Sequence, residues 1–187
     1  KKYFDNLYKP LISFVHDLPD NARILDIGCA YGFMLERFPQ TFQKYGVDVS
    51  EHAIGIAKKR LPQAQFKVVQ VEKGLPFAKN FFDLVICNDV LEHLEKPELL
   101  LKHVKTVLKP GGIFYVTTPN LNLIRRIFFA YADKMEHHIS LMPHTKLLQM
   151  FNAAGFTVVN RWTFFHLYFY IPCNGDCGVE SAVVARK

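Results

Sequence analysis

The 187-residue sequence lacks an apolar run long enough to cross a lipid bilayer. Its longest such stretch, Trp162 to Pro172, is too short and contains His166. A secretory leader is not expected either, because Asp5, Asn6 and Lys9 interrupt the apolar residues that follow the first two lysines. We therefore expect a cytoplasmic protein.

Cysteine is also scarce, and the four cysteines form no evenly spaced framework. Cys29 and Cys87 end predicted strands, where a small apolar side chain packs well. Cys173 and Cys177 share a loop and could form a disulfide or half of a metal site. No second Cys/His pair has zinc-site spacing, so free thiols are the preferred interpretation.

Internal repeats, low-complexity tracts and long linkers are absent, which predicts a single domain over residues 1–187. Half of the residues are apolar and 21% are charged, as in an ordinary globular protein. The net charge of +6 would suit an anionic substrate, nucleic acid or an acidic membrane surface. Because the basic residues are scattered, we expect a solvated basic surface and consider nucleic acid an unlikely partner.

Short β-branched runs alternate with helical patterns, which predicts a parallel sheet with helices on both faces. We expect helices after Pro97 and over Thr145 to Ala154, and an N-terminal helix within residues 1–20. Residues 121–145 form a candidate lid. The predicted strands cover residues 23–28, 45–49, 66–71, 82–87, 113–118, 156–165 and 179–185.

The most informative segment follows the first predicted strand, where small residues run into an apolar helical start at Phe33. Such a turn lets backbone N–H groups and a helix N-terminus approach a ligand closely. Asp48 ends the next strand about 20 residues on, where a carboxylate can accept hydrogen bonds from ribose hydroxyls. A nucleoside cofactor is therefore expected. The dinucleotide fingerprint fits poorly, since Ala30 and Phe33 would occupy two of its glycine positions.

The turn resembles the first motif of class I S-adenosylmethionine-dependent methyltransferases, D-x-G-x-G-x-G. Asp26, Gly28 and Gly32 match it, and Ala30 stands at the middle glycine. The order of the later motifs is similar to that of the type 11 family, roughly from residue 20 to 160. That resemblance implies a Rossmann-like, seven-stranded, mostly parallel sheet whose last strand is antiparallel. The later motifs are Leu75–Phe77, Phe82–Val85, Asn88–Leu94, Leu108–Gly112 and Thr118–Asn120.

The resemblance implies roles for the residues at the ends of the first two strands. The turn from Asp26 to Gly32, which includes Cys29 and Ala30, would hold the methionine part of S-adenosylmethionine. Asp48 would bind its ribose, and Val49 would lie against its adenine. S-adenosylhomocysteine would be the product.

Further roles are implied along the sheet. Gln70 and Val71 stand where the family often has an Asp–small residue pair, and the Gln70 carbonyl could meet the adenine amino group. Asn88 would offer its backbone near the methionine ammonium. Tyr31 and Asn120 would border the acceptor pocket.

Histidine is the natural general base for methyl transfer, because its pKa lies near neutrality. His138, in the candidate lid, is the preferred catalytic residue. His93 follows the fourth strand on the cofactor side, and packing or loop hydrogen bonding is its more ordinary interpretation. His144 is expected at a helix N-terminus.

A metal site is a lower-ranked alternative, and no resident metal is predicted. Asp89, Glu92 and His93 resemble the E-x-x-E-H motif of some ubiquinone-type and RNA 2′-O-methyltransferases, with Asp at the first position. Two carboxylates and an imidazole could bind Mg²⁺ or another divalent ion.

The sequence defines the methyl acceptor less closely than it defines the cofactor. Asn88 is not followed by the Pro-Pro pair used by many amide N-methyltransferases. Residues 123–129 and 162–171 are rich in apolar and aromatic side chains, which favours a lid helix and a buried strand over a membrane-surface contact. We expect a methyltransferase acting on a small or lipid-like acceptor. A non-catalytic S-adenosylmethionine-binding regulatory module is the alternative, and the oligomeric state is left open.

Overall fold

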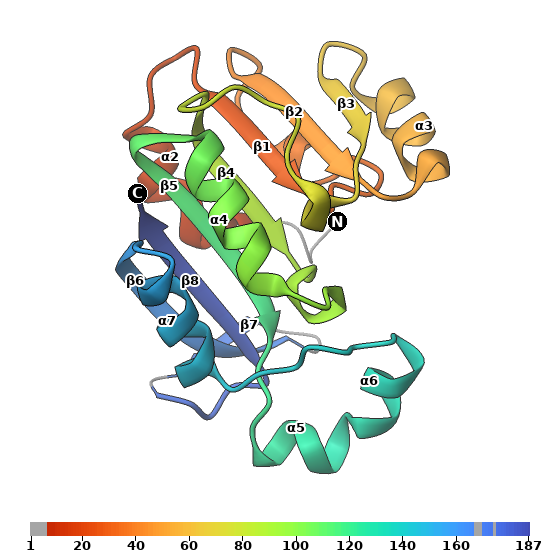
Figure 1. Cartoon of the computed structure of the whole chain (residues 1–187), viewed down its shortest axis with the longest axis vertical. Coiled ribbons are helices and arrows are strands. Elements are labelled where there is room, and N and C mark those ends of the chain that lie inside the picture. Colours follow the sequence, from red (N-terminus) through yellow and green to blue (C-terminus); the bar gives the residue numbers. More distant parts are fainter. Residues whose placement is uncertain (1–6, 167–169, 174) are drawn as a thin grey trace.

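A computed structural model describes residues 7–166, 170–173 and 175–187, which form a doubly wound α/β domain (Figure 1). Its sheet has the strand order β3-β2-β1-β4-β5-β8-β6-β7. The order reverses between β1 and β4, and this is where ligands bind in open α/β sheets. The strands are β1 (Arg23–Ile27), β2 (Gln43–Asp48), β3 (Gln65–Val68), β4 (Phe82–Asn88), β5 (Leu108–Pro119), β6 (Thr157–His166), β7 (Tyr170–Cys173) and β8 (Glu180–Arg186).

The five strands from β3 to β5 are parallel, and β8 is antiparallel to both β5 and β6. The Rossmann-like topology and the antiparallel last strand are therefore confirmed. The expected number of strands was one too few, because β7, which contains Pro172, pairs with β6 where no strand was predicted. Proline is tolerated there because β7 is an edge strand.

β5 begins earlier than expected. Leu108 pairs with Phe82, and the next pair is Ile113 with Leu84, so residues 109–112 bulge out of the ladder. The Pro110-Gly111-Gly112 run, which is typical of the end of a helix, therefore lies inside a strand rather than before one.

The helices cover both faces of the sheet, with α4 and α7 in front of it and α2 behind it in Figure 1. The predicted N-terminal helix is represented by η1 (Lys9–Leu11) and α2, and residues 1–6 lie outside the described part. α5 and α6 project from one end of the sheet. The α-helices are α2 (Ile12–His16), α3 (Glu51–Arg60), α4 (Pro97–Val107), α5 (Leu123–Phe128), α6 (Ala130–Met135) and α7 (His144–Ala153), and the other 3₁₀ turns are η2 (Leu35–Arg37), η3 (Val71–Lys73) and η4 (Leu91–His93).

The helix expected immediately after the glycine-rich turn does not form, and residues 33–42 contain only the single turn η2. Pro39 is the reason, because the residue before a proline is driven out of the helical region. Phe38 is accordingly extended, with φ −83° and ψ 153°. The turn therefore lacks a following helix N-terminus.

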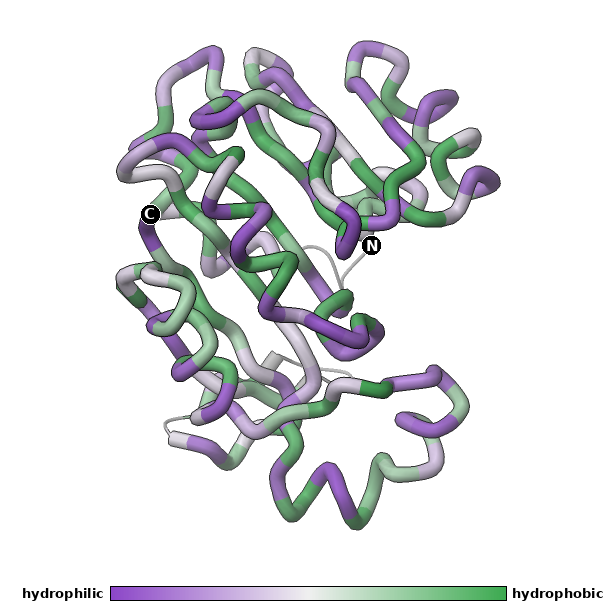
Figure 2. The backbone as a smooth tube through the Cα atoms, in the orientation of Figure 1, coloured by the Kyte–Doolittle hydropathy of each residue, from purple (hydrophilic) through white to green (hydrophobic). Residues whose placement is uncertain are grey.

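The core has two halves, one on each face of the sheet. Alternating strand residues face opposite sides, so that Leu25 and Ile27 pack with the α4 and α7 side chains, and Ile24 packs with those of α2 and α3. Figure 2 shows the central strands as mostly hydrophobic. Among the described residues, no helix combines the length and the apolar character that a membrane crossing requires. All four cysteines are free thiols in this structure.

Candidate functional site

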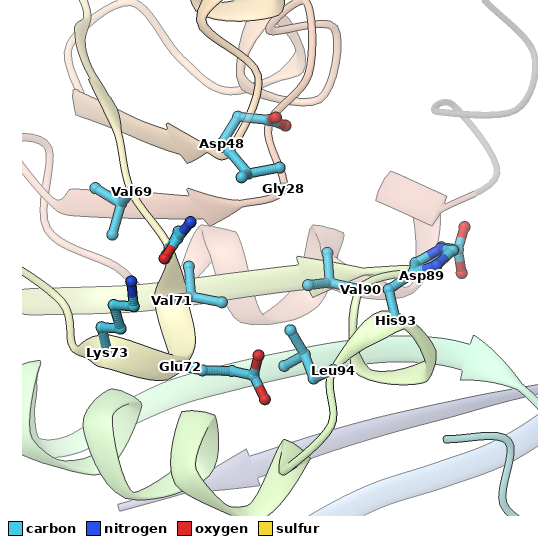
Figure 3. A pocket seen from close by; sticks show the side chains of 12 residues that line it. Gly28, Asp48, Val69, Val71, Glu72, Lys73, Asp89, Val90, His93 and Leu94 are labelled. Carbon is cyan, nitrogen blue, oxygen red and sulfur yellow. The ribbon is translucent and has the colours of Figure 1, made fainter. Parts of the chain in front are cut away.

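A crevice of about 540 Å³ lies at the carboxyl ends of β1, β2 and β4 (Figure 3). This volume is within the range of small-molecule sites. The crevice is lined by five of the residues that the sequence assigned to a cofactor: Gly28, Asp48, Val49, Gln70 and Val71.

Gly28 opens the turn at the floor of the crevice. Its φ of +73° favours glycine, and the Val90 side chain occupies the space that a Cβ would need. The backbone amides of Gly28 and Cys29 both donate to the Val47 carbonyl, at 2.8 and 3.1 Å. The turn is thus fixed to the end of β2.

Asp48 ties the turn to the next strand. Its Oδ2 accepts from the Ala30 amide at 2.9 Å, and its Oδ1 accepts from the Ser50 amide at 2.8 Å. A carboxylate oxygen can accept more than one hydrogen bond, so both remain able to bind hydroxyl groups. Ala30 has φ +43°, which explains why glycine is usual at this place in the motif.

Asp26 lies beneath the turn with only 3% of its surface exposed. No described residue donates a hydrogen bond to its carboxyl group. Burial, and secondly the charge of Asp48, raise the pKa of Asp26 to about 8. A cation bound at this end of the crevice would favour the ionised carboxylate.

The opposite end of the crevice is largely apolar. Val49 is 67% exposed, and the side chains of Val69 and Val71 complete a surface suited to a flat ring. Gln70 is at the same end and is exposed. Figure 3 places Lys73 on this side, far from Asp89 and His93.

Several lining residues were not expected from the sequence. Val90 and Leu94 belong to the Asn88–Leu94 motif, but only the fold turns them toward the crevice. Glu72 and Lys73 come from η3, for which the sequence carries no recognisable signal. Glu72 also accepts the Lys96 amide at 2.8 Å and so joins η3 to the start of α4.

A cluster of titratable side chains stands beside the crevice. His93 lines it, and the ring of His138 lies 4.9 Å from the His93 ring, measured between centroids. Possible metal-ligating atoms of Glu92, His93 and His138 lie within 4.8 Å of one another. The two histidines predicted as catalytic candidates are therefore brought together.

Glu92 is the buried member of this cluster, with 1% of its surface exposed. Its Oε2 accepts from the Thr118 hydroxyl at 2.9 Å, and its Oε1 has no partner among the described residues. Burial, and secondly Asp89, raise the pKa of Glu92 to about 8. An orphaned carboxylate oxygen beside two imidazoles is a donor set that suits a divalent cation.

Asp89 is held close to this cluster. Its backbone has φ +53°, its amide donates to the Thr117 carbonyl, and the Thr117 hydroxyl donates to its Oδ1 at 3.2 Å. The same hydroxyl lies 3.0 Å from Asn88 Oδ1. Asn88 itself does not line the crevice.

Asn120 is a correction to the expected acceptor pocket. It is fully buried, its Nδ2 donates to Asp176 Oδ1 and the Gly178 carbonyl, and its Oδ1 accepts the His144 amide at 2.9 Å. Its side chain is used to cap α7. His144 is at that helix N-terminus, as predicted. Tyr31 is 41% exposed and does not line the crevice.

Comparisons with known proteins agree with this geometry. A family model described as a methyltransferase domain matches residues 2–161. The chain is 28% identical, over 150 residues, to ubiquinone biosynthesis O-methyltransferase of Aeromonas salmonicida, covering 73% of this chain and 63% of that protein. It is 24% identical to the protein of the same name from Idiomarina loihiensis, covering 98% and 86%.

Among solved structures, a SAM-dependent methyltransferase from Methanosarcina mazei superposes with a TM-score of 0.75. The identity is 20%, and the match covers 95% of this chain and 97% of that one. This likeness supports the fold.

Proposed function

The chain belongs to the methyltransferase domain family, and from that membership we propose that it binds S-adenosylmethionine in the crevice and transfers its methyl group to a small or lipid-like acceptor. The observation that carries the proposal is the pair of carboxyl groups, Asp26 and Asp48, around the glycine-rich turn. They favour a cationic nucleoside over a dinucleotide. A pyrophosphate would meet two acidic groups and would find no helix N-terminus after the turn, where only η2 forms.

Three parts of the chain would hold the cofactor. The turn from Gly28 to Ala30, with Asp26 beneath it, suits the methionine part and its ammonium group. Asp48 suits the ribose, since its oxygens can accept further hydrogen bonds. The apolar side chains of Val49 and Val71 suit packing against the adenine ring, and Gln70 lies beside them.

When bound, S-adenosylmethionine supplies a methyl group on a positively charged sulfur, which accepts the electron pair of the broken bond. The protein's own work is to align the acceptor, exclude water and remove the acceptor's proton. His93 stands at the same side of the crevice as Asp89 (Figure 3), where an acceptor would enter, and the His138 ring lies against it. An acceptor hydroxyl would pass its proton to an imidazole nitrogen.

The proposal is tested by thermal shift. S-adenosylhomocysteine should raise the melting temperature in proportion to its binding, and NAD should not. Stabilisation by NAD alone would overturn the assignment of the crevice. Methyl transfer from labelled S-adenosylmethionine to a panel of hydroxyl-bearing acceptors then tests the activity.

A non-catalytic S-adenosylmethionine-binding module is the second candidate. Ala30 and Gln70 are the residues that favour it, since both depart from the family pattern. The acceptor panel separates the two. Binding of S-adenosylhomocysteine with no transfer to any acceptor would favour the module.

A lipid-like acceptor is supported by the surface of α5 and α6, which project from the sheet (Figure 1). Arg126 and Lys134 lie among its apolar side chains, a combination that suits an anionic lipid surface. Co-sedimentation with vesicles containing anionic lipid, compared with neutral vesicles, tests this contact. The exposed apolar residues are Leu123, Ile124, Ile127 and Phe128 in α5, Tyr131 and Met135 in α6, and Ile139 just after α6.

A further inference from the structure

Cys173 and Cys177 are two thiols near the turn that joins β7 to β8, four residues apart in the chain. Cys177 is exposed, and Cys173 is partly exposed. Burial, and secondly a hydrogen bond with the Cys177 thiol, raise the pKa of Cys173. The two sulfur atoms are therefore neighbours in the reduced protein.

Thr163 of β6 fixes the chain around both thiols. Cys173 is the ladder partner of Thr163. The Thr163 hydroxyl donates to the Gly175 carbonyl at 2.8 Å and accepts from the Gly178 amide at 3.0 Å. Gly175 has φ +86°, a left-handed conformation that lets the chain turn back. Cys173 and residues 175–178 are thus held against one point of β6.

A second cavity, of about 320 Å³, gives access to Cys173. Its wall contains Cys173, Gly175 and Asp176 together with Arg161 of β6 and His144 of α7. This cavity and the cofactor crevice have none of their described lining residues in common. A small molecule can therefore reach Cys173 without entering the crevice.

The segment of residues 175–178 also holds both ends of the candidate lid. Asn122 Nδ2 donates to the carbonyls of residues 176–178 at 2.8 to 3.2 Å, and Asn122 Oδ1 accepts the Arg125 amide of α5 at 2.9 Å. Asn120 Nδ2 donates to the same segment, and Asn120 Oδ1 accepts the His144 amide at the start of α7. A displacement of this segment is therefore transmitted to the lid.

We propose that Cys173 and Cys177 form a site of reversible thiol–disulfide exchange with small disulfides, and that its oxidation loosens the start of α5. The Cys177 thiolate attacks one sulfur of the small disulfide and releases the other half as a thiol. The Cys173 thiolate then attacks the Cys177 sulfur and releases the second half. Two protein thiols and one small disulfide thus become one protein disulfide and two small thiols, and the leaving thiolates take up the two protons that the protein gives up.

The new bond changes the geometry of the segment. The two sulfurs approach to about 2 Å, which is closer than a hydrogen bond allows. Cys173 is held in the β6–β7 ladder, so Cys177 makes most of the movement, and its carbonyl is one of those that Asn122 binds. Because Asn122 also caps α5, we expect the Arg125 amide to exchange with solvent faster, on the order of 3- to 10-fold.

Equilibration of the full chain with glutathione at graded ratios of disulfide to thiol, followed by alkylation and peptide mass spectrometry, tests the exchange. A disulfide between Cys173 and Cys177 should form, and reduced glutathione should remove it. Cys29 and Cys87 are buried and serve as internal controls that should remain thiols. Thiols that stay reduced in glutathione disulfide alone, or a Cys177 that retains glutathione as a mixed disulfide, would each overturn the proposal.

Cys173→Ser is the matched variant for the chemical step. It lacks the second thiol, so it should stop at the mixed disulfide of Cys177 with glutathione, where the wild type goes on to the protein disulfide. Wild type and variant that carry the same amount of bound glutathione would show that Cys173 does not take part, against the proposal.

Hydrogen exchange measured on the same samples tests the link to the lid. Exchange of the Arg125 amide should accelerate on oxidation of the wild type and stay unchanged in the double variant Cys173→Ser/Cys177→Ser. Asn122→Ala should exchange fast already in the reduced state and respond no further to oxidation. Equal exchange of the oxidised and reduced wild type would refute the loosening of α5. Neither measurement uses S-adenosylmethionine or an acceptor, so the result is independent of the proposed methyl transfer.

Discussion

The carboxylate of Asp48 binds the backbone amide of Ala30 at 2.9 Å, so the residue that ends β2 also fixes the turn that follows β1. Asp48→Ala should therefore remove two contributions to cofactor binding, the ribose contact and the fixed shape of the turn. Loss of a hydrogen bond to a charged group costs about 1.5–3 kcal/mol, which predicts roughly 10- to 100-fold weaker binding of S-adenosylhomocysteine. Isothermal titration calorimetry measures this change.

Asp20→Ala is the control for Asp48→Ala, since Asp20 is exposed and lies before β1, away from the crevice. It should bind S-adenosylhomocysteine as the wild type does. An Asp48→Ala protein with wild-type affinity would show that the ribose does not lie against this carboxylate.

Gly28 is restricted by two independent features, its φ of +73° and the Val90 side chain. Gly28→Ala should destabilise the fold by about 1–3 kcal/mol and weaken cofactor binding, because an added methyl group forces the packed surroundings to move. Chemical denaturation gives the first quantity, and titration with S-adenosylhomocysteine gives the second.

A double-mutant cycle separates the two features of Gly28. Val90→Ala removes the side chain that the new Cβ would meet, so Gly28→Ala should cost less stability in that background. The loss of stability that remains in that background measures the cost of the left-handed backbone conformation at residue 28. Additive effects of the two substitutions would contradict the close packing of Val90 on Gly28.

The strands were predictable from the sequence because their signal is local. Ile24, Leu25 and Ile27 are apolar and buried on the two faces of β1, as a strand covered on both sides requires, and small residues mark where the strand ends. The failures came from non-local effects. β7 exists because β6 offers it an edge, and η2 replaces a helix because Pro39 follows Gly32 after only six residues.

The site residues show the same distinction between positions that a local pattern predicts and positions that depend on distant partners. Asp48 ends a strand, and Gly28 and Val49 directly follow one, so their place at the carboxyl edge of the sheet could be predicted from the sequence. Asn120 also follows a strand, but its side chain is used by α7 and by the loop at Asp176, partners far away in the sequence. No local pattern distinguishes a buried cap from a ligand contact.

Asp26 predicts a pH dependence of ligand binding. Its pKa of about 8, due first to burial and then to Asp48, means that the empty site holds a proton at neutral pH. A cationic ligand favours the carboxylate, so binding at pH 7 should release about one proton, and affinity should rise with pH up to about 8. Calorimetry in two buffers of different ionisation enthalpy measures the proton released.

The same carboxyl group predicts a pH dependence of stability with the opposite trend. In the unfolded chain the pKa of Asp26 returns to about 3.9, so the folded state binds more protons between that value and about 8. Its contribution to stability is present at low pH and is lost as pH rises through that window. Asp26→Asn should be more stable than the wild type at pH 9, on the order of 2 kcal/mol, yet bind S-adenosylhomocysteine more weakly. Equal pH profiles of stability for the two proteins would refute the buried titration.

Glu92 allows the metal alternative to be decided. If Glu92 Oε1, His93 and His138 hold a divalent ion, exhaustive chelation should abolish methyl transfer and added Mg²⁺ or another divalent ion should restore it. If His138 acts as a metal-free base, activity should survive chelation.

Glu92→Gln sharpens the comparison, because the amide keeps an oxygen for the Thr118 hydroxyl but removes the charge that a cation needs. In the metal-free case this variant should retain most of its activity. Burial, and secondly Asp89, raise the pKa of Glu92 to about 8, so the wild type carries a buried charge at Glu92 above that pH. The variant should therefore be more stable than the wild type above pH 8. Chelation-resistant activity that nevertheless disappears in Glu92→Gln would contradict both mechanisms and would assign the proton transfer to Glu92 itself.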